Sequence, residues 1–314
     1  GSVVHGDMNG VQITGLANLA GGTMRGVQLA GISNISGNNT VGLSAAGLVN
    51  ITGDRTQGVI ISGLTSIGGD NTSGLMISGF MNVTGNMASG LHFSGAANIT
   101  GQSFGGLMAS GLLNVVGEHM NGLQIAGIAN ITASKLNGVQ MALCNYATQA
   151  RGLQIGLVNY YKEDMKGFQL GLVNANPDTR VQMMVYGGNA TPANIGVRFK
   201  NQLFYTILGI GSMYQGLNDK FSASASYRAG LSFPLYKGLS ISGDLGYQHI
   251  EAFNNKDEVI PKRLYALQAR ANLEYQFTRK FGIFATGGYG LTRFYNKSSN
   301  YDKGAIIEAG IVLF

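Results

Sequence analysis

One phrase recurs along the first half of the chain at a constant spacing. Gly-Val-Gln-Ile-Thr-Gly-Leu-Ala-Asn begins at Gly10, and variants of it recur every 16 residues. The copies begin at Gly26, Gly42, Gly58, Gly74, Gly90, Gly106, Gly122 and Gly138, and two shorter copies follow at Gly152 and Gly167. A unit this short cannot bury an apolar face alone, so successive copies must stack on one another. The period predicts a β-solenoid over residues 1–180.

The columns of the repeat have distinct characters. Val or Leu follows the first glycine, and a mostly apolar residue follows two positions later, as in Val11 and Ile13. This alternation is typical of a half-buried strand, and we expect these two apolar columns to face the core. A column of Asn that includes Asn18 and Asn34 suits a ladder of side-chain hydrogen bonds along coils about 4.8 Å apart.

The residue between the two apolar columns is then expected to face solvent. This row reads Gln12, Gln28, Ser44, Ile60, Met76, His92, Met108, Gln124, Gln140, Gln154 and Gln169. Its middle is unusually apolar for exposed positions, and exposed apolar patches often mark interfaces. Ile60, Met76, His92, Met108 and Gln124 therefore form a candidate interaction face, unless another segment covers them.

From about residue 181 the period changes from 16 to two. Eight strand-like runs follow, joined alternately by short turns such as 236–238 and by longer polar links near 215–221, 253–262 and 296–303. Each run has one apolar and one polar face, and aromatic residues fall near strand ends. These features are typical of a transmembrane β-barrel. We predict an antiparallel eight-stranded outer-membrane barrel over residues 181–314, with a soluble sandwich or lipocalin-like barrel as the alternative.

Six charged residues lie on the polar face of these strands and should point into the barrel. They are Arg198, Arg228, Asp244, Arg270, Glu274 and Glu308. Three positive and three negative charges balance, and an eight-stranded barrel has room for side chains but for no wide channel. We expect an ion-paired core, because unpaired buried charges are costly. A proton path or a narrow pore is the functional alternative.

Composition narrows the classes of function. Charged residues make up 11% of the chain, against about 25% in typical soluble domains. The net charge of +6 comes from the second half, which has no run of Lys or Arg that would indicate a nucleic-acid partner. Cys144 is the only cysteine, and the four histidines are scattered. We therefore expect no catalytic residues, no metal site and no cofactor.

Two blocks carry a resemblance to a known family. Gly152-Leu-Gln-Ile-Gly-Leu-Val-Asn159 and Gly167-Phe-Gln-Leu-Gly-Leu-Val-Asn174 resemble the surface-repeat proteins of Bacteroidota and spirochaetes. The likeness spans roughly residues 10–180. It implies a Gram-negative envelope and assigns no active residue.

These observations favour a non-enzymatic outer-membrane protein. Its barrel would contact outer-membrane lipid, and its solenoid would serve as a scaffold or binding surface for other envelope proteins. An even strand number with a periplasmic C-terminus would place the solenoid in the periplasm, whereas the surface-repeat resemblance favours the cell exterior. The alternatives are a surface adhesin or glycan-binding protein, and a small pore or transport component.

Overall fold

The computed structural model describes residues 1–212, 221–253, 263–295 and 300–314, and these are all-β. The chain forms two compact units, Gly1–Gly171 and Leu172–Phe314. The strands up to β20 are β1 (Ser2–Val4), β2 (Met8–Thr14), β3 (Ala17–Ala20), β4 (Met24–Ala30), β5 (Ser33–Ser36), β6 (Thr40–Ala46), β7 (Val49–Thr52), β8 (Arg55–Ser62), β9 (Thr65–Gly68), β10 (Asn71–Ser78), β11 (Met81–Thr84), β12 (Ala88–Ser94), β13 (Ala97–Thr100), β14 (Ser103–Ser110), β15 (Leu113–Val116), β16 (His119–Ala126), β17 (Ala129–Met141), β18 (Cys144–Ile155), β19 (Val158–Leu170) and β20 (Val173–Ala175).

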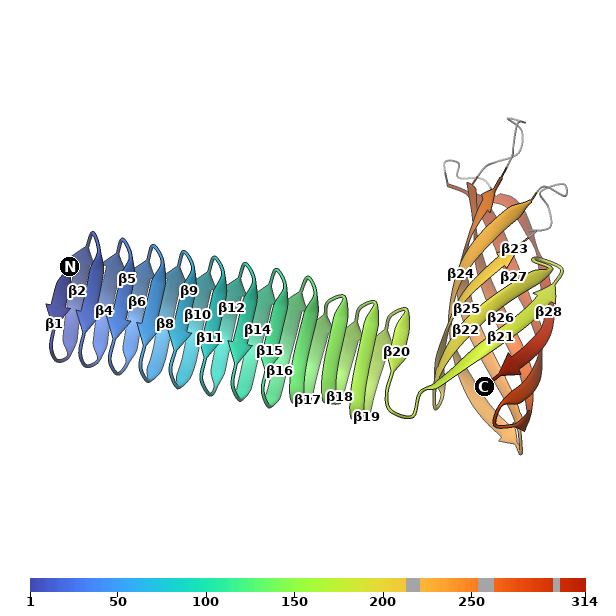
Figure 1. Ribbon diagram of the computed structural model, residues 1–314, viewed down its shortest axis with the longest axis horizontal. Coiled ribbons are helices and arrows are strands. Elements are labelled where there is room, and N and C mark those ends of the chain that lie inside the picture. The colour runs from blue at the N-terminus through green and yellow to red at the C-terminus, as the bar shows by residue number, and fades with distance from the viewer. Residues whose placement is uncertain (213–220, 254–262, 296–299) are drawn as a thin grey trace. The chain divides into compact units, whose positions relative to one another are not determined.

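The predicted solenoid is confirmed in the first unit (Figure 1). Each coil contributes a long strand and a short strand, and both pair in parallel with their copies one coil away. Gly74 lies opposite Gly90, so the pairing register equals the 16-residue period of the sequence. In β17, β18 and β19, the short strand of one coil continues directly into the long strand of the next coil. Irregularities in the pairing reduce the offset between paired residues there. This is why the last copies in the sequence are shorter.

The first glycine of each copy marks a fixed backbone geometry. These glycines, from Gly10 to Gly167, all have φ between 107° and 147°, which side chains other than hydrogen adopt only with strain. A Cβ added to Gly90 would also lie 2.2 Å from the carbonyl oxygen of Gly74 in the preceding coil. The column is therefore glycine for two reasons, the bend and the close stacking.

The interior of the solenoid is mostly polar. The expected Asn ladder is present: Asn82 donates to Asn98 at 2.8 Å, and Asn98 donates to Asn114 at 2.9 Å. A second ladder of Gln side chains lies beside it, where Gln140 donates to Gln124 at 2.8 Å. Stacked amides satisfy one another because each has both a donor and an acceptor.

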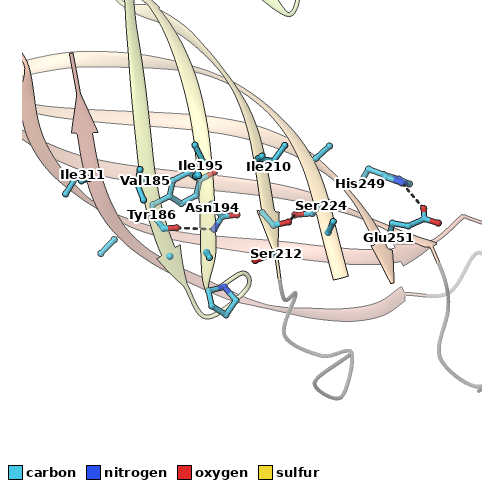
Figure 2. A pocket seen from close by; sticks show the side chains of 17 residues that line it. Val185, Tyr186, Asn194, Ile195, Ile210, Ser212, Ser224, His249, Glu251 and Ile311 are labelled. Atoms are coloured by element: carbon cyan, nitrogen blue, oxygen red, sulfur yellow. Dashed lines mark hydrogen bonds and ion pairs between the residues drawn. The ribbon is translucent and has the colours of Figure 1, made fainter. Parts of the chain in front are cut away.

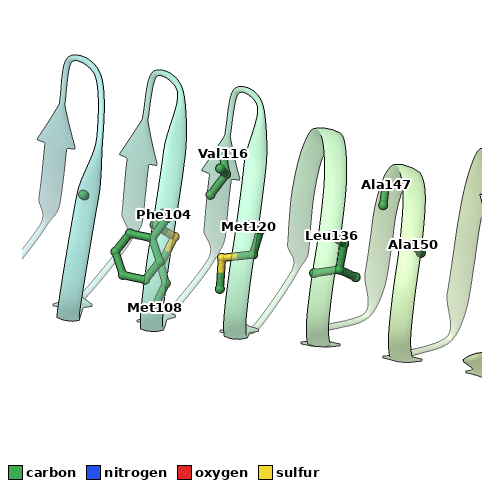
Figure 3. Packing of buried hydrophobic residues seen from close by; sticks show 8 residues of the cluster. Phe104, Met108, Val116, Met120, Leu136, Ala147 and Ala150 are labelled. Atoms are coloured by element: carbon green, nitrogen blue, oxygen red, sulfur yellow. The ribbon is translucent and has the colours of Figure 1, made fainter. Parts of the chain in front are cut away.

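The middle coils replace part of this polar interior with an apolar cluster. It comprises Ala88, Phe104, Met108, Val116, Met120, Leu136, Ala147 and Ala150, and Figure 3 shows most of them between the two walls of the coils. Met120 and Leu136 of this cluster belong to the same coils as Gln124 and Gln140, so apolar and amide side chains share the interior there.

The second unit contains a closed antiparallel barrel of eight strands, as predicted. Its strands are β21 (Arg180–Gly188), β22 (Ala193–Asn201), β23 (Phe204–Ser212), β24 (Ser222–Tyr236), β25 (Leu239–Ala252), β26 (Arg263–Thr278), β27 (Phe281–Phe294) and β28 (Asn300–Leu313). β21 pairs with β28 and closes the barrel.

The connections of the barrel alternate in length. Two-residue turns join β22 to β23, β24 to β25 and β26 to β27. The longer links expected near 215–221, 253–262 and 296–303 lie largely outside the described residues. Because β21 belongs to the barrel, its first and last strands both leave at the end with the short turns.

Candidate binding surfaces

The predicted interaction row lies inside the solenoid, which corrects the sequence-based expectation. The exposed fractions of Ile60, Met76, His92, Met108 and Gln124 are between 0 and 2%. The flanking columns face outward instead, with Val11 68% and Ile13 66% exposed. Alternation assigns residues to faces but does not say which face is inside. Here the thin coil encloses flat, stackable amides, and most branched aliphatic side chains of the repeat lie on its outside.

His92 occupies this interior without a polar partner. Its ring meets Phe104 edge-on at 4.9 Å, and its Nε2 makes no hydrogen bond. Burial lowers the pKa of His92 to about 4, so the ring is neutral at physiological pH. Its place in the Gln column and its apolar contacts indicate a packing role.

All charged side chains of residues 1–171 lie along one edge of the solenoid. They belong to the turn that precedes each long strand, or to the start of that strand, and we call this the polar edge. Its charged members are Asp7, Arg25, Asp54, Arg55, Asp70, Glu118, Lys135, Arg151, Lys162, Glu163, Asp164 and Lys166.

The polar edge is hollowed in its middle. Gly105 and the small side chains of Ser73 and Ser89 leave a depression of about 630 Å³, which Arg55 and His119 also line. Met87, Ala88 and Phe104 line it as well, so cationic, imidazole and hydroxyl groups stand there beside apolar side chains. This depression is therefore a candidate site in the solenoid for a partner that has both polar and apolar groups.

The opposite edge carries aliphatic side chains. The last residue of the turn that follows each long strand forms this apolar edge: Leu16, Ile32, Leu48, Leu64, Phe80, Ala96, Leu112, Ile128, Leu143 and Leu157. All of these except Ala96 are between 43 and 60% exposed. The two walls between the edges, which we call the flanks, present the columns that begin with Val11, Ile13 and Leu19. Alternation within the strands did not indicate this surface, although every charge of residues 1–171 falls within the five positions before the first glycine of a copy.

The six charged residues expected inside the barrel are all buried and paired. Arg198 donates two hydrogen bonds to Glu274, at 2.5 and 2.9 Å. Arg228 binds Asp244 in the same two-pronged way, at 2.7 and 2.8 Å. Such paired geometry is the strong form of the arginine–carboxylate contact.

The third pair, Arg270 with Glu308, lies next to the Arg228–Asp244 pair. Arg270 donates to both oxygens of Glu308 at 3.1 Å, and Nη1 of Arg228 lies 3.6 Å from the same carboxylate. A cavity beside Arg198, Arg228 and Glu274 measures about 10 Å³, which is at the lower limit for one water molecule. The centre of the barrel is therefore filled.

A larger hollow lies at the loop end of β21–β24, as Figure 2 shows. It measures about 1010 Å³, and its walls are mostly apolar, including Val185, Ile195 and Ile210. His249 and Glu251 stand at its margin with Nε2 3.4 Å from the carboxylate. This surface could take an apolar chain with a polar end.

In the described ranges, no group of three or more His, Cys, Asp and Glu residues could hold a metal ion. No helix in the described part of the chain has the length and apolarity that crossing a bilayer requires.

Comparison with solved structures gives a likeness to a bacterial β-barrel domain. The chain is similar to the N-terminal β-barrel domain of OprF from Pseudomonas aeruginosa, over 42% of this chain and 93% of that one, with 16% identity and a TM-score of 0.31. No protein-family model and no curated protein matches the chain.

Proposed function

We propose that this is a non-enzymatic outer-membrane protein, whose barrel anchors a solenoid that acts as a scaffold for other envelope proteins. The observation that carries the proposal is the inverted build of the barrel. Leu245 and Ile307, 71% and 67% exposed, face outward, while the paired arginines and carboxylates face inward. An apolar outer band around a polar interior is the pattern of membrane barrels.

The strand number bears on the side of the membrane. Eight strands bring both ends of the barrel to the end with the short turns, and short turns face the periplasm in outer-membrane barrels. The solenoid would then be periplasmic, with its polar edge and the hollow beside Arg55 and His119 available to partners there. A Gram-negative envelope, as the surface-repeat resemblance implies, is part of this proposal.

Single-cysteine labelling in intact cells tests this arrangement. In a Cys144→Ala background, a cysteine replaces Asp302 at the loop end, Lys237 in a short turn or Gln57 on the polar edge, all exposed positions. A membrane-impermeant maleimide should label the Asp302 variant alone, and the other two only after the outer membrane is permeabilised. Lys237 is the matched control, because it reports the short-turn end independently of the solenoid.

Other labelling patterns would contradict parts of the proposal. Labelling of both the Asp302 and Gln57 variants in intact cells would place the solenoid outside and favour the adhesin alternative. Labelling of the Lys237 variant in intact cells would mean that the short turns face the cell exterior, so the barrel would have the opposite orientation in the membrane. The pore alternative predicts steady conductance in planar bilayers, whereas the filled interior predicts none.

A further inference from the structure

We propose that the solenoid is itself a lipid-inserted body, with its apolar edge and flanks among the acyl chains of one leaflet and its polar edge at the water interface. The first ground is the continuity of the apolar surface. Leu16 at the edge, Ile13 on one flank and Leu19 on the other are exposed, and their columns stay almost wholly apolar along the stack. Continuous exposed apolar surface of this extent is rare on proteins surrounded by water.

The second ground is the segregation of charge. The apolar edge and both flanks carry no charged side chain, because every charge of residues 1–171 lies on the polar edge. About six residues separate the two edges along a long strand, or about 20 Å at about 3.3 Å per residue. One leaflet contributes about 15 Å of hydrocarbon, half of a core of about 30 Å. The distance from the apolar edge to the polar edge therefore matches the hydrocarbon of one leaflet together with its headgroup boundary.

The third ground is the satisfaction of backbone polar groups. Sheet structure enters hydrocarbon only where its N–H and C=O groups are paired. Between coils these pairs are made on every side: β10 pairs with β8 and β12, and the turns do the same, as where Leu64 donates to Leu48 at 2.9 Å. The Asn and Gln ladders do this for the side chains inside.

Lipid fits this surface better than a protein partner does. The apolar surface faces three directions, two flanks and an edge, over the whole stack. One folded partner covers a single direction, whereas acyl chains conform to all three. Insertion itself does not depend on the proposed function. We assign the solenoid to the periplasmic leaflet of the outer membrane, and this assignment rests on the proposed function, because it requires a periplasmic solenoid.

The native cysteine supplies a direct probe. Cys144 is exposed and adjoins Leu143 of the apolar edge, while Asn137 of the same coil lies on the polar edge. The full chain is labelled with an environment-sensitive fluorophore at Cys144, or at Asn137→Cys in a Cys144→Ala background. It is then reconstituted in phosphatidylcholine vesicles with and without brominated acyl chains. The Cys144 probe should lose most of its emission to bromine, and the Asn137 probe should keep its emission.

A third probe separates this inference from the proposed function. Leu245→Cys in the Cys144→Ala background reports the outer wall of the barrel. Quenching at Leu245 with water-like emission at Cys144 overturns the inserted solenoid and leaves the anchor standing. Quenching at Cys144 without quenching at Leu245 supports insertion and refutes the barrel anchor. Emission at Cys144 that is typical of an apolar environment but is not quenched by bromine means that protein, such as a second copy, covers the edge. This outcome also overturns the inference.

Matched charge variants test the direction of insertion. Leu112→Asp with Ile128→Asp places charges on the apolar edge, and Gln57→Asp with Ser89→Asp places the same number on the polar edge. Each Asp on the apolar edge should lower the partition coefficient of the solenoid from water into the bilayer by about tenfold or more, since carboxylates are strongly disfavoured in hydrocarbon. The polar-edge pair should leave the Cys144 quenching unchanged. Circular dichroism confirms that both proteins stay folded, and equal quenching in both would overturn the inference.

Discussion

The solenoid and the barrel both turn polar side chains inward and apolar ones outward, but they fill their interiors differently. The solenoid uses neutral amides such as Asn98, and the barrel uses ion pairs such as Arg228 with Asp244. A charge at an interior position of a repeat would recur about 4.8 Å away in each neighbouring coil, where like charges repel. A barrel does not repeat, so it can set opposite charges on facing strands. The symmetry of each unit therefore decides the chemistry of its core.

Removing one barrel cation should have the largest effect on stability. Arg228→Ala would leave Asp244 buried without its main partner, and Glu308 would lose one of two arginines. We expect a loss of about 3–5 kcal/mol in the free energy of unfolding, measured by urea titration in detergent micelles. The double variant Arg228→Met with Asp244→Leu should recover most of it. Wild-type stability of Arg228→Ala would refute an ionic core.

In the solenoid, the glycine column should be the most sensitive to substitution. Gly90→Ala places a Cβ 2.2 Å from a carbonyl oxygen at φ +107°, so we expect a cost of about 2–3 kcal/mol. Gly105→Ala is the matched control, because a Cβ there meets nothing within 4 Å. Thermal unfolding should separate the two variants. Equal midpoints would mean that the stack yields to the extra atom.

The neutrality of the solenoid core can be tested with pH. His92 has its pKa lowered to about 4 by burial, against 6.5 in the unfolded chain. The unfolded state therefore takes up the proton first, and stability falls as pH drops below 6.5, by about 2 kcal/mol at pH 5. His92→Met, which copies Met76 and Met108, should remove this part of the pH dependence. An unchanged profile for the variant would show that His92 is not the group responsible.

The smallest effect concerns the Asn ladder. Ser66 interrupts it naturally, and its hydroxyl bonds Ser62 at 2.7 Å and Ser78 at 2.9 Å. Ser94 and Ser110 hold the equivalent places around Asn98, and their hydroxyl groups have no hydrogen-bond partner. Asn98→Ser should therefore cost about 1 kcal/mol or less, while Asn98→Ala costs about 1–3 kcal/mol because it leaves buried groups unpaired. Equal costs for the two in chemical unfolding would contradict this account.

The sequence predicted the architecture better than it predicted the surfaces. A period of 16 and a fixed glycine column dictate stacked coils, and alternating faces with short turns dictate the barrel. The inside of the solenoid was assigned wrongly because Val11 and Gln12 alternate equally well in either orientation. The usual assumption that aliphatic residues are buried decided the matter. That assumption fails for this solenoid, because its interior is mostly polar.

Two patterns in the same sequence indicated the true orientation. Met76 and Met108 stand in a column otherwise rich in Gln, and such mixing is natural in an interior where either type can stack. Asp54, Asp70 and Glu118 share one phase of the repeat, so charge is admitted on one edge only. The cross-strand pairing of Arg198 with Glu274 required the closed barrel, because 76 residues separate them in the chain.

The constant register between coils has a consequence for how such proteins change over generations. A recombination event that adds or removes one repeat leaves every ladder, glycine contact and edge aligned, because each coil meets its neighbour in the same way. The body then grows or shrinks in steps of one coil, while its cross-section stays the same. Copy number alone would act as a ruler that sets how far the structure reaches.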